Sequence, residues 1–415
     1  MNITKGDVQE LRRRLKKTEC TFGRLCGCYV NSGKQIVTKF TEQFSELEED
    51  EYYKYLEIAK KTFSGTLGAN LLELEFDRSD SGIEHQKYLL TLKDSKLANE
   101  ELLDRLYGQV IEEYSYPGNY LIVVYHDVYD VPSKATSGED QDESTELYAY
   151  CVCAVCPVEL AKPALGYKED ENRIGARERD WVVGLPDLGF VYPAFANRGS
   201  DVNAVMYYVK TGRPSHPEFI ENVLGCVAQR TAAEDKLAFK NVVHDAFGED
   251  EEQADAAFFQ MQKTISAMVA EREADESLPP VELTAEAVSG LATEAEVPDE
   301  VRAQIEKSYE QVFGDQPPQA HNVLDSRLVE EGTVKAHTAA LEQKVAVLQQ
   351  ELAHQAANAD TDEDDVPWET GTVIDVRMPQ ERAVNVHTEV VEGQKCLVIP
   401  LTGDESARIN GVEVE

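Results

Sequence analysis

The sequence predicts an α+β protein of several domains, and three observations support this class. The chain has 415 residues, which suits roughly two to four domains of ordinary size. Stretches with helical spacing of apolar residues alternate with short β-branched and aromatic runs that are typical of strands. Polar, acidic segments separate these stretches. We expect a mixed sheet with helices in the N-terminal region, a helical middle and a small antiparallel β unit at the C-terminus.

The composition is that of an acidic globular protein. Hydrophobic residues make up 42% of the chain and charged residues 28%, and the formal net charge is −38. The negative charge argues against non-specific nucleic-acid binding, because contacts with phosphates need Lys and Arg. The charge is uneven, since residues 1–40 hold nine Lys or Arg against three acids. This basic end either meets an acidic partner or docks on its own protein, and we favour the second alternative.

The sequence points to a cytoplasmic protein. Its first residues are polar and charged, without the apolar stretch of a secretory signal. The longest apolar runs, such as Tyr120–Tyr125, are far shorter than the roughly 18–20 residues that cross a membrane. The eight cysteines lie in strand-like contexts, which favours free thiols in a reducing compartment.

Local signals predict the N-terminal elements. Thr4, with Asp7 three residues later, has the pattern of a helix N-cap. Strands at Arg24–Val30 and Gln35–Phe40 are expected to form a hairpin around the turn at 31–34. The other periodic stretches of this region predict a helix at 48–63, a strand at 71–76 and helices at 83–94 and 100–115.

Two β-rich stretches follow, on either side of an acidic segment. Tyr120–Val128 is apolar at nearly every position, which is typical of a strand covered on both faces. Residues 133–146 lack apolar periodicity and are expected to be a loop insertion or a domain joint. Leu147–Val158 is again strand-like, whereas the aromatic, Gly- and Pro-rich stretch 181–195 predicts irregular structure packed on a sheet.

The second half of the chain is helical before it returns to strands. In the helix expected at 333–355, Leu341, Val345, Leu348 and Leu352 have a 4-3-4 spacing. This spacing suits a core face, which we favour, or a short coiled-coil seam. The expected parts of the chain are an α+β domain at 1–132, a second α+β region ending in helices at 146–275, a small helical pair at 278–330, an amphipathic helix with an acidic linker at 331–365, and a small β unit at 366–415 with strands at 372–376, 384–391 and 395–401.

Two glycine-containing segments are similar to phosphate sites but suit structural roles better. In Gly27–Lys34, five residues rather than four separate Gly27 from Gly33, and Gln35 replaces the Ser or Thr that holds magnesium. A hairpin turn is therefore the better interpretation. Ser64–Gly68 could surround an anion, but two glycines after a helix more often form its C-cap and the following turn.

Closely spaced cysteines raise the question of a zinc or iron–sulfur site. Residues 154–155, between the last two thiols, are apolar and β-prone, whereas a metal-binding knuckle needs a tight turn. In a regular strand Cys151 and Cys153 share one face and Cys156 takes the other. We expect buried thiols, no bound metal and no cofactor.

The best candidate for chemistry is the group His126, Asp127 and Asp130, at the expected end of the buried strand. One His with two carboxylates can perform acid–base catalysis or hold a cation. The spacing places His126 and Asp130 on one face and Asp127 on the other. These three are the candidate catalytic residues, and the alternative is a polar strand end that leads into a loop.

Eight short segments together carry a resemblance to a known family: Arg12–Arg14, Cys26–Asn31, Ser64–Gly68, His126–Pro132, Cys156–Val158, Asp180–Val183, Leu188–Phe190 and Pro193–Phe195. In these segments the sequence resembles a bacterial family of proteins with a domain of unknown function, number 4317. The resemblance runs through most of residues 1–325 and resumes in the last 50 or so. It implies a bacterial cytoplasmic protein of similar architecture and carries no known activity or functional residues.

Hypotheses from different classes of function remain open. We favour a non-catalytic interaction or regulatory protein whose partner is another protein, or a second copy held weakly through 333–355. The alternative is a hydrolase or a metal-assisted enzyme that uses the His126 group. A pocket in which this group meets Arg179 or Asp180 would favour the enzyme. A third hypothesis, nucleic-acid mimicry, would need acids in ordered rows on rigid elements.

Overall fold

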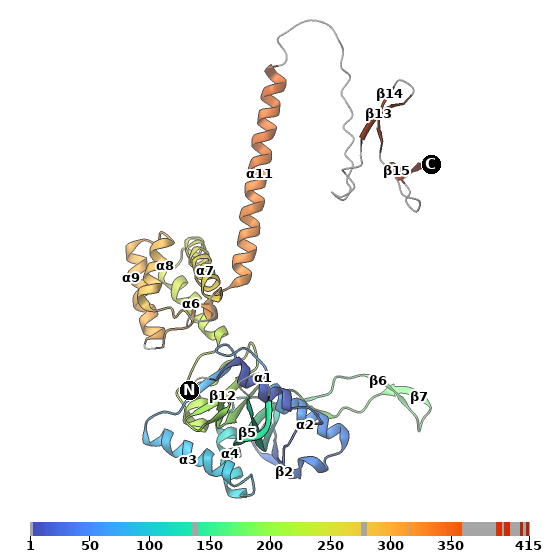
Figure 1. Ribbon diagram of the computed structural model, residues 1–415, viewed down its shortest axis with the longest axis vertical. Coiled ribbons are helices and arrows are strands. Elements are labelled where there is room, and N and C mark those ends of the chain that lie inside the picture. Colours follow the sequence, from blue (N-terminus) through green and yellow to red (C-terminus); the bar gives the residue numbers. More distant parts are fainter. Residues whose placement is uncertain are drawn as a thin grey trace. The chain divides into compact units, whose positions relative to one another are not determined.

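The computed structural model confirms the α+β class. Its internal contacts divide the chain into two compact units, Met1–Thr338 and Ala339–Glu415. The first unit contains a sheet body, built on strands β1–β12, and a helical bundle, α6–α10 (Figure 1). The residues that the structure describes are 3–134, 140–274, 280–314, 316–358, 387–391, 394–398, 407–409 and 412–414.

The sheet body is built on one eight-stranded sheet with the strand order β2-β1-β4-β5-β9-β12-β3, in which β8 also pairs with β5. Every pairing between these strands is antiparallel, which corrects the expectation of a mixed sheet. Short hairpins, rather than crossover helices, join several neighbouring strands. The strands are β1 (Arg24–Val30), β2 (Ile36–Gln43), β3 (Leu71–Glu75), β4 (Asn119–Lys134), β5 (Asp140–Leu160), β8 (Trp181–Val183), β9 (Leu188–Tyr192) and β12 (Ala204–Val209).

The hairpin of β4 and β5 passes through the acidic segment that the sequence placed in a loop. Its register runs from Asn119 opposite Val158 to Lys134 opposite Asp140. Residues 135–139 lie outside the described ranges. The backbone groups of β4 form hydrogen bonds with those of β5. Strands from the two expected regions, 1–132 and 146–275, therefore belong to one sheet.

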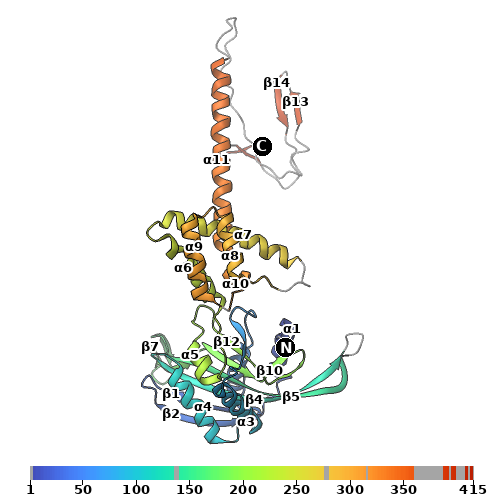
Figure 2. The same cartoon turned by 90° about the vertical axis from the view of Figure 1, so that its left-hand side faces the viewer.

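Helices cover both faces of this sheet. Tyr120, Ile122 and Val124 of β4 belong to the core under α3 and α4, which lie together in Figure 2. Leu121 and Val123 belong to the core under α1 and α2. This three-layer arrangement explains why β4 is apolar at successive positions. The covering helices are α1 (Lys5–Arg14), α2 (Glu49–Lys61), α3 (Asp80–Asp94), α4 (Glu100–Glu113), α5 (Pro217–Phe219) and the π-helical turn η2 (Ile220–Leu224).

The local signals near the N-terminus behave as predicted. The Thr4 hydroxyl accepts a hydrogen bond from the Asp7 amide at 3.2 Å, and the Asp7 carboxylate accepts one from the Thr4 amide at 2.9 Å. In the β1–β2 turn, Asn31 Oδ1 accepts bonds from the amides of Gly33 and Gln35. The segment similar to a phosphate loop is therefore a hairpin.

The cysteine side chains distribute over the two cores as the strand period requires. Cys151 and Cys153 lie in the core under α3 and α4, and Cys156 lies in the opposite core. The described cysteines are free thiols, and burial raises the pKa of Cys28 to about 12. Among the described residues, no group of three or more His, Cys, Asp or Glu side chains could hold a metal ion.

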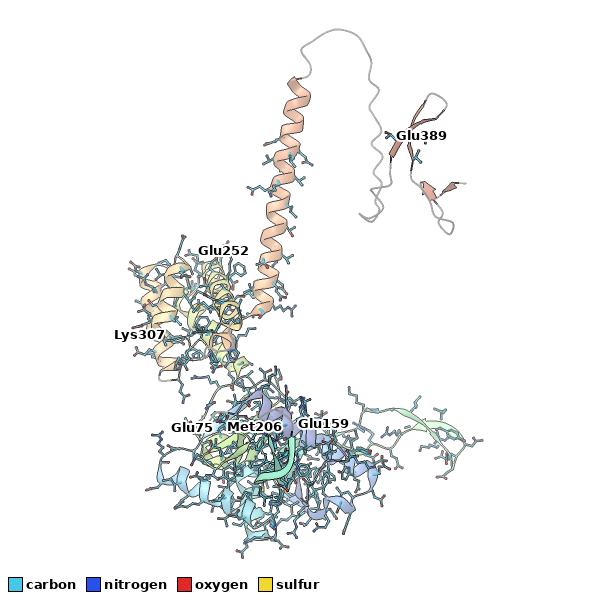
Figure 3. The ribbon with its side chains drawn as sticks, in the orientation of Figure 1. Glu75, Glu159, Met206, Glu252, Lys307 and Glu389 are labelled. Carbon is cyan, nitrogen blue, oxygen red and sulfur yellow. The ribbon has the colours of Figure 1, made fainter. Side chains whose placement is uncertain are left out.

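The helical bundle has a core of its own, centred on aromatic side chains such as Phe239, Phe258 and Tyr309. Figure 3 shows its side chains as a dense group around α6–α9, with Glu252 and Lys307 labelled, and a second dense group around Met206 in the sheet body. The bundle consists of α6 (Ala232–Phe247), α7 (Glu251–Glu273), α8 (Ala285–Glu294), α9 (Asp299–Phe313) and α10 (Ala320–Val323).

The last helix, α11 (Ser326–Asn358), starts on this bundle. A Cβ at Gly332 would lie 2.1 Å from the Phe259 ring, so only glycine allows this close packing on α7. Within the described ranges no helix has the length and apolar character needed to cross a lipid bilayer.

The remaining described strands form short antiparallel hairpins. The expected C-terminal β unit contains two of them, and its predicted strand at 372–376 lies outside the described residues. Another hairpin, β6–β7, projects from the sheet body (Figure 1). The strands are β6 (Leu165–Lys168), β7 (Arg173–Ala176), β10 (Ala194–Ala196), β11 (Gly199–Asp201), β13 (His387–Val391), β14 (Gln394–Val398), β15 (Ala407–Ile409) and β16 (Val412–Val414).

We predict that Gly27→Ala destabilises the protein by at least about 2 kcal/mol, measured by urea denaturation. A Cβ at this position in β1 would lie 2.4 Å from the Phe40 ring and 2.8 Å from the Ile122 carbonyl oxygen. The matched control is Gly108→Ala in α4, where a Cβ meets nothing within 4 Å and should stabilise the helix by up to about 1 kcal/mol. Equal effects of the two substitutions would show that the close strand contact is unimportant.

Candidate functional site

The structure separates the three residues of the predicted site. They lie within β4, which continues to Lys134, and not at the end of a strand. His126 and Asp127 are buried, at 6% and 2% exposure, on opposite faces of the sheet. Asp130 is exposed. The expected alternation of faces is present, but no single group of three forms.

Asp127 is the centre of a hydrogen-bonded cluster on the α1 side of the sheet. Its carboxylate accepts bonds from the Tyr150 hydroxyl at 2.7 Å, the Thr21 hydroxyl at 2.7 Å and the Val128 amide at 2.8 Å. The Arg14 guanidinium lies 3.3 Å away and forms an ion pair with it. Since both carboxylate oxygens are occupied, Asp127 serves to attach the end of α1 to the sheet.

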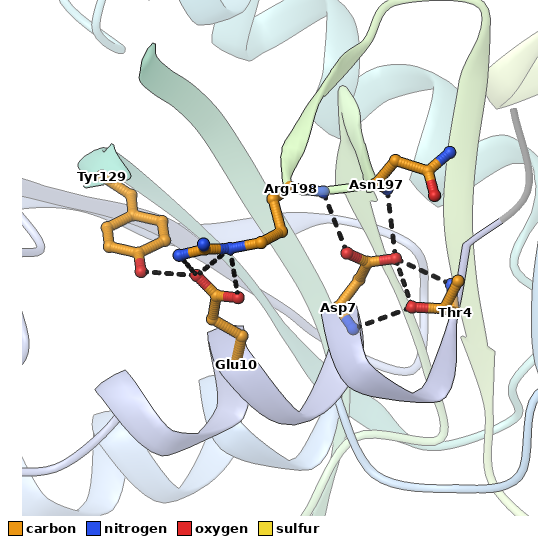
Figure 4. A network of polar contacts seen from close by, with 6 residues as sticks. All are labelled: Thr4, Asp7, Glu10, Tyr129, Asn197 and Arg198. Carbon is orange, nitrogen blue, oxygen red and sulfur yellow. Dashed lines mark hydrogen bonds and ion pairs between the residues drawn. The ribbon is translucent and has the colours of Figure 1, made fainter. Parts of the chain in front are cut away.

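A second set of contacts attaches the start of α1 (Figure 4). The Arg198 guanidinium donates two bonds to Glu10 at 2.9 Å and a third at 3.2 Å, and the Tyr129 hydroxyl donates to the same carboxylate at 2.7 Å. Asp7 accepts bonds from the amides of Asn197 and Arg198, two residues with positive φ in the β10–β11 turn. We call the contacts of Asp7, Glu10 and Arg14 the α1 clamp. Through it the basic N-terminal helix docks on its own protein.

His126 faces the opposite core. Burial lowers its pKa, and the nearby charges of Lys96, Lys93 and Arg24 act in the same direction, whereas Asp127 opposes them. The imidazole is therefore neutral at neutral pH.

Arg179 and Asp180, which the His126 group would meet in an enzyme, have contacts of their own. Arg179 donates to the Ala161 carbonyl at 2.6 Å, and Asp180 lies 4.0 Å from Arg177. Both contacts are exposed, and Arg198 pairs with Glu10 of α1. Nothing in these contacts joins the group to His126.

Sequence reasoning missed a cavity of about 260 Å³ between the loop after α2 and the helical bundle. Arg230, Asp235 and Asn322 line it together with Gly68. The Thr231-x-x-Glu234 pattern is readable as a capping box that starts α6, and the structure contains this cap. The pattern does not indicate that the next residue, Asp235, is buried. Its burial results from tertiary packing, which a local pattern does not encode.

The loop Ser64–Gly68 does not have the polarity of an anion site. At its end, carbonyl groups bond to the bundle. The Gly68 oxygen accepts from Asn322 Nδ2, and the oxygen of the next residue, Ala69, accepts from the Ala232 amide, each at 2.9 Å. The amides of Thr66 and Gly68 form bonds within the loop. The loop therefore acts as a helix end and a contact with the bundle.

A different surface feature lies on α11. Leu341, Val345 and Leu348 are 48%, 52% and 56% exposed, so the core face favoured from the sequence is wrong. Val334, one heptad before Leu341, is 66% exposed. We call these four residues the α11 stripe. Leu341 and Leu348 share one heptad position and Val345 holds the other, which is the pattern of a two-stranded coiled coil.

Comparison with known proteins places the whole chain in one group. A family model described as a domain of unknown function (DUF4317) matches residues 1–412. The chain belongs to this family. No curated protein and no solved structure matches the chain. The DUF4317 match includes the α1 clamp, the cavity and the α11 stripe, and the family description names no activity, so function has to be argued from these sites.

We predict that Asp127→Ala costs about 3–5 kcal/mol of unfolding free energy, because it leaves the partly buried Arg14 and the Tyr150 hydroxyl without their acceptor. The matched control is Asp130→Ala, the same change on an exposed side chain of the same strand, which should stay within about 0.5 kcal/mol. Chemical denaturation followed by circular dichroism measures both. A small effect of Asp127→Ala would contradict the role of the clamp.

We predict that His126→Gln makes stability less dependent on pH. Burial lowers the pKa of folded His126 below its ordinary value of 6.5, so the unfolded chain binds this proton more readily. The contribution of His126 is complete above pH 6.5 and declines as the pH falls through the unfolded value. Urea denaturation at pH 7.5 and 5.5 should show a smaller loss for the variant than for the wild type. Equal losses would contradict a buried, neutral imidazole.

Proposed function

We propose that the protein is a non-catalytic interaction or regulatory protein of the cytoplasm that pairs with a second copy of itself through α11. The observation that supports this most directly is the α11 stripe. Its apolar side chains are about half or more exposed on a long helix, and regular exposed apolar stripes of this kind mark interaction sites.

The arrangement of β4 weakens the enzyme hypothesis. The Asp127 carboxylate is occupied by four donors, one of them on α1, and His126 lies in the other core. A hydrolase or metal-assisted enzyme that used His126, Asp127 and Asp130 would need these groups to converge on a substrate. The contacts of the two buried residues support a structural role for them instead.

The order of residues in the stripe favours a parallel pair. Leu341 and Leu348 take the d position of the heptad, and Val345 takes the a position between them. Valine at a with leucine at d favours two parallel strands, because the β-branched side chain packs well in the parallel a layer. Thr338 occupies the preceding a position, which weakens the seam. A reversible, concentration-dependent dimer is the expected state.

The surrounding residues support pairing between identical chains. Lys344 and Gln349 occupy the flanking g and e positions. Because glutamine is uncharged, the lysine of one chain meets no like charge at this pair of positions in a parallel dimer. Gln343 and Gln350 lie on the outer face of the same helix, away from the seam. The proposed cytoplasmic location draws on the buried, free thiols of the sheet, which suit a reducing compartment.

We predict that the double variant Leu341→Glu, Leu348→Glu is monomeric at concentrations where the wild type is a dimer. Four like charges would enter the seam of each pair. The matched control is Gln343→Glu, Gln350→Glu, which adds the same charge on the outer face and should keep the dimer. Sedimentation velocity over a hundredfold range of concentration measures the mass. A wild type that stays monomeric throughout, or equal behaviour of the two double variants, would contradict the proposal.

Disulfide cross-linking tests the direction of pairing. In a Cys396→Ser background, Val345→Cys should cross-link two chains under mild oxidation, because a parallel register places the two copies of this residue opposite each other. An antiparallel pair brings two copies of one residue together only at its centre. Val334→Cys, in the same background, should therefore cross-link as well in a parallel pair. Cross-linking at only one of the two positions, or at neither, would contradict the parallel register.

A further inference from the structure

The cavity between the sheet body and the helical bundle has the features of a small-molecule site. Three distant segments line it: the loop at Gly68 and Leu72, the start of α6, and the residues around α10. Its volume of about 260 Å³ is near the lower end of the roughly 300–1,000 Å³ of ordinary ligand pockets. A ligand of only a few non-hydrogen atoms suits this space.

Arg230 supplies a fixed positive charge at the cavity. Its guanidinium donates to the Val312 carbonyl at 2.5 Å and lies 5.2 Å from the centroid of the Phe313 ring. The carbonyl bond uses one of the five N–H donors of a guanidinium. Arg230 is thus held by α9 while it lines the cavity.

Asp235 supplies a negative charge on the same wall. It is 7% exposed, and the charge of Arg230 acts on it without an ion pair within 4 Å in the described part of the chain. Burial raises its pKa to about 6, although the charge of Arg230 and a hydrogen bond with Asn322 act in the opposite direction. Glu234, which also raises this pKa, is bound to Thr231 and Ser215. Arg230 and Asp235 therefore face one cavity as separate charges.

Asn322 adds a hydrogen-bond acceptor that has no donor within the described ranges. The residue is 8% exposed, and its Nδ2 donates to the Gly68 carbonyl at 2.9 Å. Its Oδ1 is buried without a hydrogen-bond partner among the described residues. An unsatisfied buried acceptor is destabilising, and a hydrogen-bond donor from a ligand would satisfy it.

We propose that this cavity binds a small α-amino acid as a zwitterion, with its ammonium group at Asp235 and Asn322 Oδ1 and its carboxylate at Arg230. The ammonium supplies donors to both acceptors, and the carboxylate accepts from the guanidinium. A simple amine would leave Arg230 unpaired, and a simple anion would approach Asp235 unfavourably. Leu72 and Pro318 line the same cavity and suit a short aliphatic side chain.

This site is independent of pairing through α11 and adds a regulatory input to the proposed function. Its walls come from both the sheet body and the bundle, so an occupied site would tie the two together. Binding would also depend on pH. Protonation of Asp235 removes the partner of the ammonium group, so affinity falls as the pH decreases through about 6.

Isothermal titration calorimetry with the full-length protein at pH 7.5 tests the proposal, with thermal unfolding as a second readout. The probes are glycine, L-alanine and L-valine. Two blocked compounds, N-acetyl-L-alanine and L-alaninamide, each retain one of the two charged groups. We expect the amino acids to bind and to raise the melting temperature in proportion to the logarithm of their concentration. Both blocked compounds should bind at least tenfold more weakly.

Substitutions locate the binding. Asp235→Asn and Arg230→Gln should each weaken L-alanine binding at least tenfold, and Arg230→Gln should leave the weak binding of L-alaninamide unchanged. The matched control is Asp299→Asn on α9, whose side chain is 89% exposed and which should bind as the wild type does. If Asp235→Asn fails to fold, Arg230→Gln still carries the test.

Three results would overturn the proposal. The first is that none of the three amino acids binds. The second is that L-alanine binds no better than its blocked forms, which would show that the site does not recognise the ammonium and carboxylate groups together. The third is that binding survives both cavity substitutions, which would show that the amino acid binds elsewhere. A tenfold weaker affinity at pH 5 than at pH 7.5 would support the role of Asp235.

Discussion

The pairing of β4 with β5 is the constraint on which the rest of the structure depends. These two strands form the longest hairpin of the sheet, and every other strand joins it through β1 or β9, or directly as β8 does. Because both faces of β4 are apolar, helices have to cover the sheet on both sides. In such an interior a buried charge is costly unless specific partners satisfy it. Asp127 is acceptable there because Arg14, Thr21 and Tyr150 come to it.

Local chemistry made much of this fold predictable. The cap at Thr4, the turn at Asn31 and the alternation of Cys151, Cys153 and Cys156 depend on neighbours in the sequence, and the structure has them as expected. Strand partners are different, since they depend on residues far apart. The Gly and Pro residues of the stretch 181–195 predicted irregular structure, yet Leu188–Tyr192 forms the fully buried strand β9. Tertiary packing outweighed local propensity there.

In the candidate sites, too, local features were predictable from the sequence and long-range contacts were not. Sequence spacing placed His126 and Asp127 on opposite faces, but it could not show that the strand continues past them or that α1 supplies a partner for Asp127. The α11 stripe was visible as a pattern, whereas its exposure was not, because burial depends on what the rest of the chain covers. Asp235 and Asn322 gave no signal, since 87 positions separate them and only the fold brings them to one cavity.

The edge position of β3 has a consequence for how the protein is made. Among the strands that the structure describes, β3 (Leu71–Glu75) pairs with β12 alone, at Ala204–Tyr208, and the Ile3 amide donates to Glu73. The sheet therefore cannot be completed until more than 200 residues have left the ribosome. Contacts of such high sequence separation slow folding, and they leave apolar strands without partners in the meantime. During synthesis β3 would remain without β12 for many seconds, because the ribosome adds only about 5–20 residues per second.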